Sequence, residues 1–544
     1  MSHLLFPGRH LVNTTFQDRY LKHVLGRTPS SLAGFIAGRG ALLNAPTEII
    51  FAVTSANQEN SRFNPIPFHI RAIGVDRFAR QLQAELKVRY RIFGIPHYGH
   101  TNNFASFTIK EIDLQSERAI QLTPENCLVL CSTPEVIKLY QALGFSIAPA
   151  EMAETGSHQS TPIEIIREIG ARGNDWSSSP LIFANLARSH FSLFEDFPEV
   201  PQRIARLYQD PLTNQDGSLT STRNYSSYAR GMNEIIRLKY LDIQKSIRPG
   251  RIVDEGCADG ALLAEISRDF PDSDLFGIDL SAEFASRFLE RQRAGEFGGA
   301  YVHFFHRNLF DRIFEPESVD TTLCNSTLHE IWSYGDGEKS VRGYLAEKLR
   351  QLRPGGRLLI RDVVGPDKGE REILLWCSDT DGHNLSVEEA VQHKDRSAEW
   401  LHQLSTRSRF YLFALDFLGG QSGFTFNEES YDSRTVFRLA FRQAAEFLSK
   451  KDYTDNWASE MNEEFCFWSF TQWKGVLGEI GFRVLENSND APAGSRAYVN
   501  PWIVQHRYEG HVKLSTVAGA EIPWPPTNMI LVAERALASD ESSA

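Results

Sequence analysis

The chain has 544 residues, with 42% hydrophobic and 23% charged side chains and a formal net charge of −12. The length allows roughly three or four domain-sized units, and the composition is ordinary for a soluble globular protein. The acidic excess argues against a protein that binds nucleic acid mainly by charge, although a local basic groove would still permit it.

The cysteine spacing and the hydropathy pattern exclude several further classes. The six cysteines show no paired metal-ligand spacing, so we expect buried thiols and predict no metal site. No apolar stretch approaches the roughly 18 residues of a membrane-spanning helix, and the opening apolar run is too short for a signal peptide. We therefore expect a cytoplasmic, reduced and soluble protein with no membrane partner; the sequence does not indicate its oligomeric state.

The first part of the chain alternates strand and helix patterns. Strands are predicted at residues 4–7, 48–54, 90–96 and 127–131, and helices at residues 16–25 and 70–86. Strands that alternate with helices indicate an α/β domain with a parallel sheet covered on both faces.

Short signatures follow these elements in a definite order. They are Gly8-Arg9, Ser55-Ala56, Asn64-Pro65, Ile95-Pro96 and the run from Ile166 to Trp176. In this order they resemble archaeal-type nicotinamide-mononucleotide adenylyltransferases, over about residues 1–210 of this chain. The resemblance implies a nucleotidyltransferase-like Rossmann domain in which Gly8, Arg9, Ser55 and Arg167 bind a nucleotide.

The catalytic HxGH motif of that family is degenerate here. The matching positions are Thr14 to Gln17, and neither histidine is present. Without the two imidazoles, charge on the transferred phosphates would lose its stabilising groups. The string His97-Tyr-Gly-His100 follows the third strand instead of the first, which makes a coincidence the simpler interpretation. We predict a non-catalytic nucleotide-binding domain; a scaffold or dimerisation unit is the alternative.

Residues 211–223 are rich in turn formers and predict a linker to a second domain, residues 224–544. A helix is predicted from Tyr225 to Tyr240, with Ile236 and Leu238 on its apolar face. Tyr228 and Arg230 are candidates for contact with a ligand; ordinary core packing for Tyr228 and a surface charge for Arg230 are the alternative.

Two apolar runs that end in an acid define the centre of the second domain. Residues 252–262 read as a strand ending at Asp254, a small-residue turn and a helix start, which brings backbone close to a ligand. The run from Leu275 to Asp279 reads as the next strand, and its terminal carboxylate suits two ribose hydroxyls. Ala258 stands where a second glycine is usual, and we expect it to fit with φ below zero.

Together with the run from Leu352 to Asp362, these motifs resemble class I S-adenosylmethionine-dependent methyltransferases over about residues 220–365. The resemblance implies S-adenosyl-L-methionine as the cofactor. The cofactor-binding residues that it implies are Tyr228, Asp254, Glu255, Gly256, Cys257, Gly260, Asp279, Leu280, Asn308, Leu309 and Asn325.

The loop from Asn325 to Tyr334 follows the fourth predicted strand and should face the transferred methyl group. His329 and Glu330 in this loop could accept a proton from a nucleophile, and Asp362 at the end of the fifth strand is a comparable candidate. A structural role for His329 is the alternative.

About a hundred residues, 365–465, interrupt the core after the fifth strand. Helices are predicted at residues 386–404, 410–418 and 433–450, which makes this a helical insertion, either a lid or an acceptor pocket. Its aromatic residues either line a planar acceptor site or form simple core. The aromatics are Phe410, Tyr411, Phe413, Phe417, Phe467, Trp468 and Trp473.

The leading hypothesis is a methyltransferase that acts on a small molecule. In a more specific version of this hypothesis, the acceptor is linked to a nucleotide and the first domain presents it. A bifunctional nucleotidyltransferase and methyltransferase is one alternative. An RNA or protein methyltransferase with an N-terminal docking domain is the other, which the acidic net charge disfavours. The sequence does not identify the acceptor.

Overall fold

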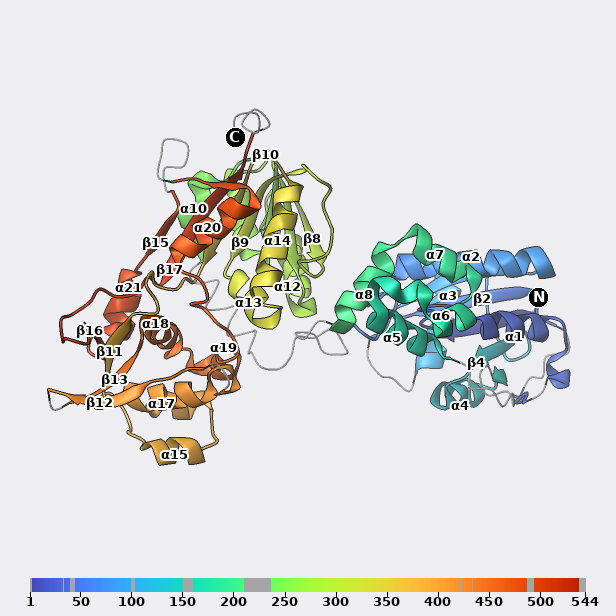
Figure 1. The fold of residues 1–544 in the computed structure, drawn as a ribbon. Coiled ribbons are helices and arrows are strands. Elements are labelled where there is room, and N and C mark those ends of the chain that lie inside the picture. Colours follow the sequence, from blue (N-terminus) through green and yellow to red (C-terminus); the bar gives the residue numbers. More distant parts are fainter. Residues whose placement is uncertain are drawn as a thin grey trace. The chain divides into compact units, whose positions relative to one another are not determined.

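A computed structural model describes residues 2–32, 34–39, 45–98, 103–149, 160–209, 236–420, 423–432, 434–486 and 494–537. The chain divides into two compact units, residues 1–218 and 219–544. Figure 1 gives the course of the chain through both units. Each unit is described by itself below.

The first unit is built on a five-stranded parallel sheet with the order β3-β2-β1-β4-β5. Its strands are β1 (His3–Gly8), β2 (Glu48–Thr54), β3 (Arg89–Ile95), β4 (Cys127–Cys131) and β5 (Ser146–Pro149). The four predicted strands are confirmed to within two residues. The order reverses between β1 and β4, so the carboxyl ends of these strands flank the crevice in which such sheets bind ligands.

Helices cover both faces of this sheet. They are α1 (Thr15–Leu25), α2 (Phe68–Leu86), α3 (Phe104–Gln115), α4 (Pro134–Ala142), α5 (Pro162–Arg172), α6 (Pro180–Asn185), α7 (Arg188–Asp196) and α8 (Glu199–Gln209). Alternate residues of β1 explain the two layers: Leu4 packs with α1 and α2, whereas Leu5 packs with α3 and α4.

The second unit has a sheet with the order β14-β17-β10-β9-β6-β7-β8, in which β14 and β17 are antiparallel additions to five parallel strands. The strands are β6 (Arg251–Glu255), β7 (Asp274–Asp279), β8 (Tyr301–His306), β9 (Val319–Asn325), β10 (Leu352–Asp362), β14 (Phe482–Val484) and β17 (Asn528–Arg535), with β15 (Arg496–Tyr498) beside β17. The predicted mixed α/β class with parallel, Rossmann-like sheets is confirmed.

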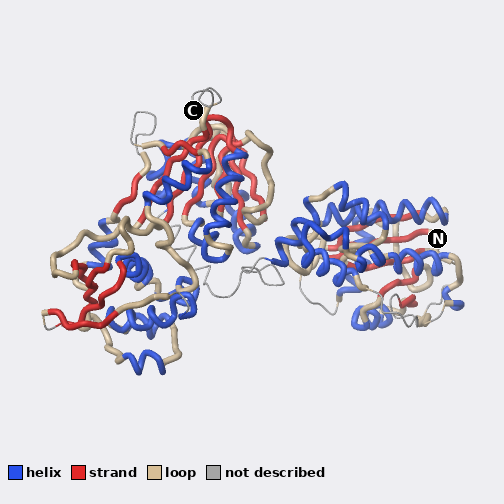
Figure 2. Tube along the Cα trace, in the orientation of Figure 1, coloured by secondary structure: helices blue, strands red, loops and turns tan. Residues whose placement is uncertain are grey.

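Two helical layers enclose this sheet, as the colouring of Figure 2 shows. One layer contains α10 (Ile236–Ile243), α11 (Ala261–Asp269) and α12 (Ala282–Arg293); the other contains α13 (Leu328–Tyr334), α14 (Glu338–Gln351) and α20 (Phe470–Ile480). In β10, Leu359 faces the first layer, while Leu358 and Ile360 face the second. Burial on both faces explains why this strand is an unbroken apolar run.

The inserted segment is a subdomain with its own sheet, so the prediction of a purely helical insertion was wrong. The sheet order is β12-β13-β11-β16, from β11 (Glu372–Cys377), β12 (Asn427–Tyr431), β13 (Arg434–Ala440) and β16 (Val512–Thr516). The helices are α15 (Val387–Gln392), α16 (Ala398–Gln403), α17 (Thr406–Asp416), α18 (Phe441–Lys450), α19 (Trp457–Glu460) and α21 (Pro501–Ile503), followed by a π-helical turn (Val504–Tyr508). Residues 434–440, predicted as helix, form β13 because Val436, Phe437 and Leu439 pack in a sheet core.

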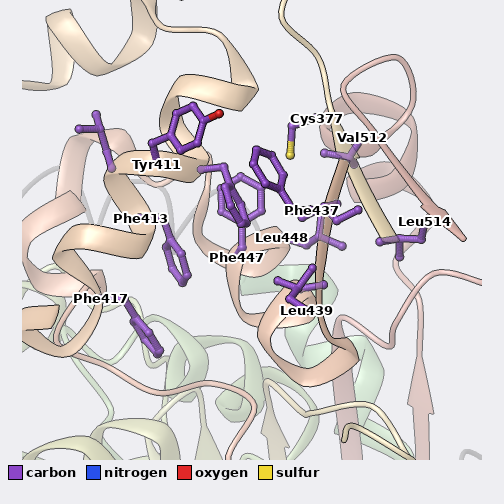
Figure 3. Close-up of a cluster of buried hydrophobic side chains, with 14 of the residues drawn as sticks. Cys377, Tyr411, Phe413, Phe417, Phe437, Leu439, Phe447, Leu448, Val512 and Leu514 are labelled. Atoms are coloured by element: carbon purple, nitrogen blue, oxygen red, sulfur yellow. The ribbon is translucent and has the colours of Figure 1, made fainter. Parts of the chain in front are cut away.

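The aromatic residues of this subdomain form its core. Figure 3 shows Tyr411, Phe413, Phe417, Phe437 and Phe447 gathered between α17, α18 and β13. The predicted candidates Phe410, Tyr411, Phe413 and Phe417 are all at most 7% exposed, and Phe467, Trp468 and Trp473 are buried against β10. The core interpretation therefore holds for these aromatic rings, and none of them lines an open acceptor site.

The helix before β6 differs from its predicted orientation. Its described part is α10, and Leu238 is 64% exposed whereas Lys239 is 2% exposed. The assignment of Leu238 to the apolar face was wrong, because α10 turns Lys239 inward, where its Nζ lies 3.4 Å from Ser326 Oγ, and leaves Leu238 on the outside. Among the described residues, no helix is long and apolar enough to cross a membrane.

Candidate functional site

The parallel strands of the second unit bring their carboxyl ends to one edge of the sheet, where the turn after β6 lies. In this turn Gly256 has φ +73°, and a Cβ atom on it would lie 2.5 Å from Thr327 Oγ1. Thr327 Oγ1 donates to the carbonyl of Glu255 at 3.2 Å. The glycine therefore admits the loop after β9 against the turn, and Thr327 is a contact that the sequence did not reveal.

Ala258 adopts φ +46°, so the expectation of a negative φ was wrong. The left-handed conformation directs its N–H to Asp279 Oδ2, which accepts the hydrogen bond at 2.9 Å. Asp279 Oδ1 accepts a second bond, from the N–H of Ser281 at 2.8 Å. The strain at Ala258 thus serves to orient the carboxylate at the end of β7.

The backbone holds the Asp279 carboxylate at both of its oxygens. Each oxygen accepts one of these two bonds, and the N–H of Leu280 also acts on the carboxylate. The alternative role as a helix cap belongs to Ser281, whose side chain accepts from Phe284 N at the start of α12. Burial raises the pKa of Asp279 to about 6, although the backbone N–H groups of Ser281 and Ala258 oppose that rise.

Asp254, at the end of β6, lies close to a buried lysine of α10. Burial and the charges of Asp279 and Glu255 raise the pKa of Asp254 to about 7, while Lys239 opposes the rise. Burial and the charge of Arg361 lower the pKa of Lys239 to about 7, and its Nζ lies 3.4 Å from Ser326 Oγ. Asp254 and Lys239, an acid and a base of similar pKa, therefore lie near each other at this edge of the sheet.

The side chain of Glu255 does not point to the same face of the sheet as that of Asp254, which corrects its predicted role in cofactor binding. Successive strand residues point to opposite faces, and the carboxylate of Glu255 lies under α14, where Lys348 Nζ contacts Oε1 at 2.5 Å. Both side chains are at most 1% exposed. The pair is a structural ion pair of the core.

The remaining predicted cofactor residues surround the same edge. Cys257 is buried, with its Sγ near the position that a Cβ on Gly277 would occupy, and Gly260 begins α11 with φ +81°. Leu280 is held by His306, whose Nε2 lies 2.9 Å from the Leu280 carbonyl. The residues Asn308, Leu309 and Asn325 follow β8 or end β9 at this edge, and Tyr228 and Arg230 lie outside the described residues.

The candidate catalytic residues His329 and Asp362 form a buried pair. His329 Nδ1 lies 2.7 Å from Asp362 Oδ1, and the two residues are 5% and 1% exposed. Asp362 also accepts from the N–H groups of Thr327 (3.2 Å), Leu328 (2.8 Å) and Val363 (2.8 Å). Four donors occupy this carboxylate, which leaves it no capacity to act as a base.

The other ring nitrogen of His329 faces a carboxylate of the inserted segment. His329 Nε2 lies 3.6 Å from Glu463 Oε2. Burial disfavours the charged imidazolium, but the charges of Asp362, Glu463 and Glu330 outweigh it and raise the pKa of His329 to about 9. His329 is therefore a cation at neutral pH, which is the wrong protonation state for a general base. Glu330, the third candidate, lies on α13 and is only partly buried.

In the first unit, a buried arginine organises the predicted nucleotide-binding edge. Arg71 donates from Nη1 to the carbonyls of Arg9 (2.7 Å) and Thr54 (2.8 Å), and from Nη2 to that of Ser55 (2.8 Å). It thereby ties the loop that follows Gly8, the last residue of β1, to the end of β2. Ser55 has φ +54° and its side chain is buried.

Three further arginines of the first unit gather at one tyrosine. Burial raises the pKa of Tyr208, and the charges of Arg167, Arg62 and Arg9 oppose that rise. Arg167 is exposed on α5, and Arg9 Nη1 donates to the carbonyl of Phe63 at 2.8 Å. The predicted pair Arg9 and Arg167 therefore shares one neighbourhood, to which Arg62 adds a third guanidinium.

The positions of the degenerate HxGH motif serve the fold. Thr14 caps α1 by accepting from Gln17 N at 3.1 Å, and Gln17 Oε1 accepts from Thr14 N at 3.1 Å. This capping box occupies both side chains that would replace the histidines. His97 exchanges bonds with Asn57, whereas Gly99 and His100 lie outside the described residues. Across the described ranges, no group of three or more His, Cys, Asp or Glu side chains is placed to hold a metal ion.

Comparison with known proteins identifies the second unit. A family profile described as a methyltransferase domain matches residues 253–360. Among solved structures, a SAM-dependent methyltransferase from Methanosarcina mazei is 14% identical, with a TM-score of 0.28 over 54% of this chain and 97% of that chain. A 1,6-didemethyltoxoflavin-N1-methyltransferase from Burkholderia thailandensis, solved with 1,6-didemethyltoxoflavin and S-adenosylhomocysteine, is 14% identical, with a TM-score of 0.26 over 57% of this chain and 85% of that chain. The family profile runs from β6 to β10, the strands that carry Asp254, Asp279 and Asp362, and the second unit therefore contains a methyltransferase domain.

Proposed function

We propose that this enzyme methylates a small molecule bound at the carboxyl edge of the second sheet, beside α13 and the inserted subdomain. The observation that carries the proposal is the convergence of two features at this edge. The Asp254 and Asp279 carboxylates lie at the ends of β6 and β7, and the α13 loop packs against the same turn through Thr327. Donor and acceptor must meet in line for methyl transfer, and one edge offers room for both.

The residues of the turn after β6 fit S-adenosylmethionine as the methyl donor. When bound, this donor supplies an electrophilic methyl group on its sulfonium. Asp279 would accept hydrogen bonds from the ribose hydroxyls, because a carboxylate can accept more hydrogen bonds than its two short backbone bonds. The backbone from Gly256 to Ala258 would border the methionine portion, with Asp254 beneath it. Asn308 and Leu309 would border the adenine ring.

Alignment carries most of the catalysis in this proposal. His329 is held as a cation between two carboxylates, so it orients α13 and does not remove a proton. An acceptor that needs deprotonation would use Glu330 or solvent. Methyl transfer requires little else from the protein once the nucleophile faces the methyl group.

For the first unit we propose a ligand with a phosphate or pyrophosphate group, at the reversal of strand order between β1 and β4. The support is the gathering of Arg9, Arg62 and Arg167 near Tyr208, since one guanidinium group can donate two parallel hydrogen bonds to two oxygens of a phosphate. Adenylyl transfer is not part of this proposal, because Thr14 and Gln17 are committed to the cap of α1. A nucleotide-linked acceptor is the specific version of the proposal.

Calorimetry with S-adenosylmethionine and S-adenosylhomocysteine on the full chain tests the donor site. Asp279→Ala should weaken binding by roughly ten- to a hundredfold through loss of the ribose bonds. Asp274→Ala is the matched control, because this exposed acid begins the same strand at the opposite edge of the sheet. Unchanged affinity in Asp279→Ala would remove the donor assignment.

Thermal stabilisation of the full chain by ATP, AMP, nicotinamide mononucleotide and pyrophosphate tests the first unit. At least one of these should raise its unfolding temperature, and Arg9→Ala together with Arg167→Ala should abolish that effect. No dinucleotide should form from ATP and nicotinamide mononucleotide. Dinucleotide formation that is lost in Arg9→Ala would establish the bifunctional alternative instead.

A further inference from the structure

The inserted subdomain rejoins the methyltransferase core through residues 463–465, which contact α13. Trp332 Nε1 donates to Glu464 Oε2 at 2.9 Å, and Glu464 N donates to Ser333 Oγ at 2.8 Å. Tyr334 OH donates to Glu463 Oε1 at 3.1 Å. Three consecutive residues of α13 are therefore bonded to two consecutive residues of the returning segment.

His329 lies at the centre of this contact. Its ring is held by Asp362 of β10 at 2.7 Å and faces Glu463 at 3.6 Å, so each ring nitrogen has its own carboxylate. The ring of Phe465 meets the imidazole edge-on, with 4.9 Å between ring centroids. Glu330, on α13 itself, is the third acidic neighbour of the ring. The core strand and the inserted subdomain thus hold the same side chain from two directions.

The returning segment is in turn fixed to the subdomain. Lys450, at the end of α18, donates to the carbonyl of Glu463 and pairs with Glu446 at 2.7 Å. Glu446 accepts from the N–H groups of Phe465 (2.8 Å) and Cys466 (2.7 Å). Lys450 and Glu463 are fully buried. Any displacement of α18 would therefore be transmitted to Glu463 and to His329.

We propose that Glu463 is a positioning residue of the methyl-transfer site, which holds His329 and with it α13 in register with β10. The proposal deepens the proposed function, because it takes α13 to be the acceptor side of the site. Asp362 alone fixes one ring nitrogen and the first turn of α13. Glu463 supplies the second point of attachment for the His329 ring, so the orientation of this side chain and of α13 depends on the docked subdomain. The inserted subdomain then acts on the chemistry through one carboxylate as well as by covering the site.

The test uses the full chain with Glu463→Gln, which keeps the size of the side chain and removes its charge. The His329 imidazole is followed by NMR with selectively labelled histidine, assigned from a His329→Gln sample. We expect the midpoint of His329 titration to fall by about one pH unit or more, because one of two facing carboxylates is lost. Amide hydrogen exchange of residues 327–334 should accelerate at least tenfold, while affinity for S-adenosylmethionine changes less than threefold.

Tyr334→Phe is the matched control, since it removes the hydroxyl that donates to Glu463 and leaves the carboxylate facing His329. It should leave the His329 midpoint within a few tenths of a unit. Glu463→Asp keeps the charge but moves it away from His329 by one methylene, so it should lower the midpoint and accelerate the exchange less than Glu463→Gln does. If Glu463→Gln does not fold, these two readouts in Glu463→Asp decide between the outcomes. An unchanged midpoint and unchanged exchange in both Glu463 variants would overturn the proposal. If the unmodified chain does not bind S-adenosylmethionine, the proposed function is contradicted. The His329 midpoint and the exchange of residues 327–334 can still be measured in that case, so the two failures are distinguishable.

Discussion

The strongest quantitative expectation concerns the affinity for S-adenosylmethionine as a function of pH. Asp254 is buried beneath the proposed donor site, where burial and the charges of Asp279 and Glu255 raise its pKa to about 7. The donor carries a sulfonium and an ammonium group, so it should bind better to the ionised carboxylate. Donor binding should therefore strengthen as pH rises through 7.

The size of the effect follows from the fraction of protein with Asp254 ionised. For a pKa of about 7, roughly one tenth is ionised at pH 6 and nine tenths at pH 8, and the apparent Kd scales inversely with this fraction. The Kd should be about tenfold weaker at pH 6 than at pH 8, a difference of about 1.4 kcal/mol. Two neighbours titrate in the same range, Asp279 with a pKa of about 6 and Lys239 with a pKa of about 7.

Isothermal titration calorimetry at pH 6, 7 and 8 measures this dependence, and buffers of different ionisation enthalpy count the protons released on binding. Asp254→Asn should bind more weakly than the unmodified chain at pH 8 and lose most of the slope, with the remainder due to Asp279 and Lys239. Asp259→Asn is the matched control, because this acid of the same turn is paired with Arg291 at 2.9 Å. A flat profile in the unmodified chain, or an unchanged slope in Asp254→Asn, would refute the reasoning.

Three further outcomes are expected. Gly256→Ala should weaken donor binding at least tenfold and lower the unfolding temperature, because φ is +73° and the new Cβ would meet Thr327 Oγ1. Calorimetry and thermal unfolding measure the two effects, and Gly343→Ala, in open space on α14, should change neither quantity. His329→Ala should lower the free energy of unfolding by about 3–5 kcal/mol in urea titration, because its removal leaves a buried carboxylate without its partner. The first unit should lose about 2 kcal/mol between pH 6.5 and pH 5, because burial lowers the pKa of His190 to about 3 and the unfolded chain takes up the proton first. Hydrogen exchange of α2 amides measures this loss, and His190→Leu should reduce it.

The strands of both sheets could be predicted because each is a short apolar run at a parallel-sheet position. Residues 48–54 and 127–131 match β2 and β4 to the residue. The segment 433–450 failed for a physical reason: β13 and α18 follow each other without a turn, so one long amphipathic pattern concealed a change of period. Pairing with β11, which lies much earlier in the chain, and with the adjacent β12 decides in favour of the strand.

The glycine-rich turn could be placed from sequence, but its conformation could not. Ala258 takes a positive φ because its N–H is needed by Asp279, and that requirement comes from a residue on another strand. A local pattern contains no information on such a partner, so the usual preference of alanine gave the wrong sign. The role expected of Asp279 depends on its place at a strand end, which local sequence does determine, and it remains a prediction until donor binding is measured.

The acids of the site could be picked out from the sequence, whereas the cation that pairs with each of them could not. Asp254 faces Lys239 from α10, Glu255 pairs with Lys348 from α14, and Asp362 pairs with His329 from α13. Each cation comes from a helix that packs on the sheet, so its relevance depends on tertiary structure. Burial and the charge of Arg361 lower the pKa of Lys239, the partner of Asp254, to about 7, so the charge of Asp254 is one that a bound sulfonium can still change. We therefore expect Glu255 and Asp362 to hold the fold around the site and Asp254 to respond to the donor.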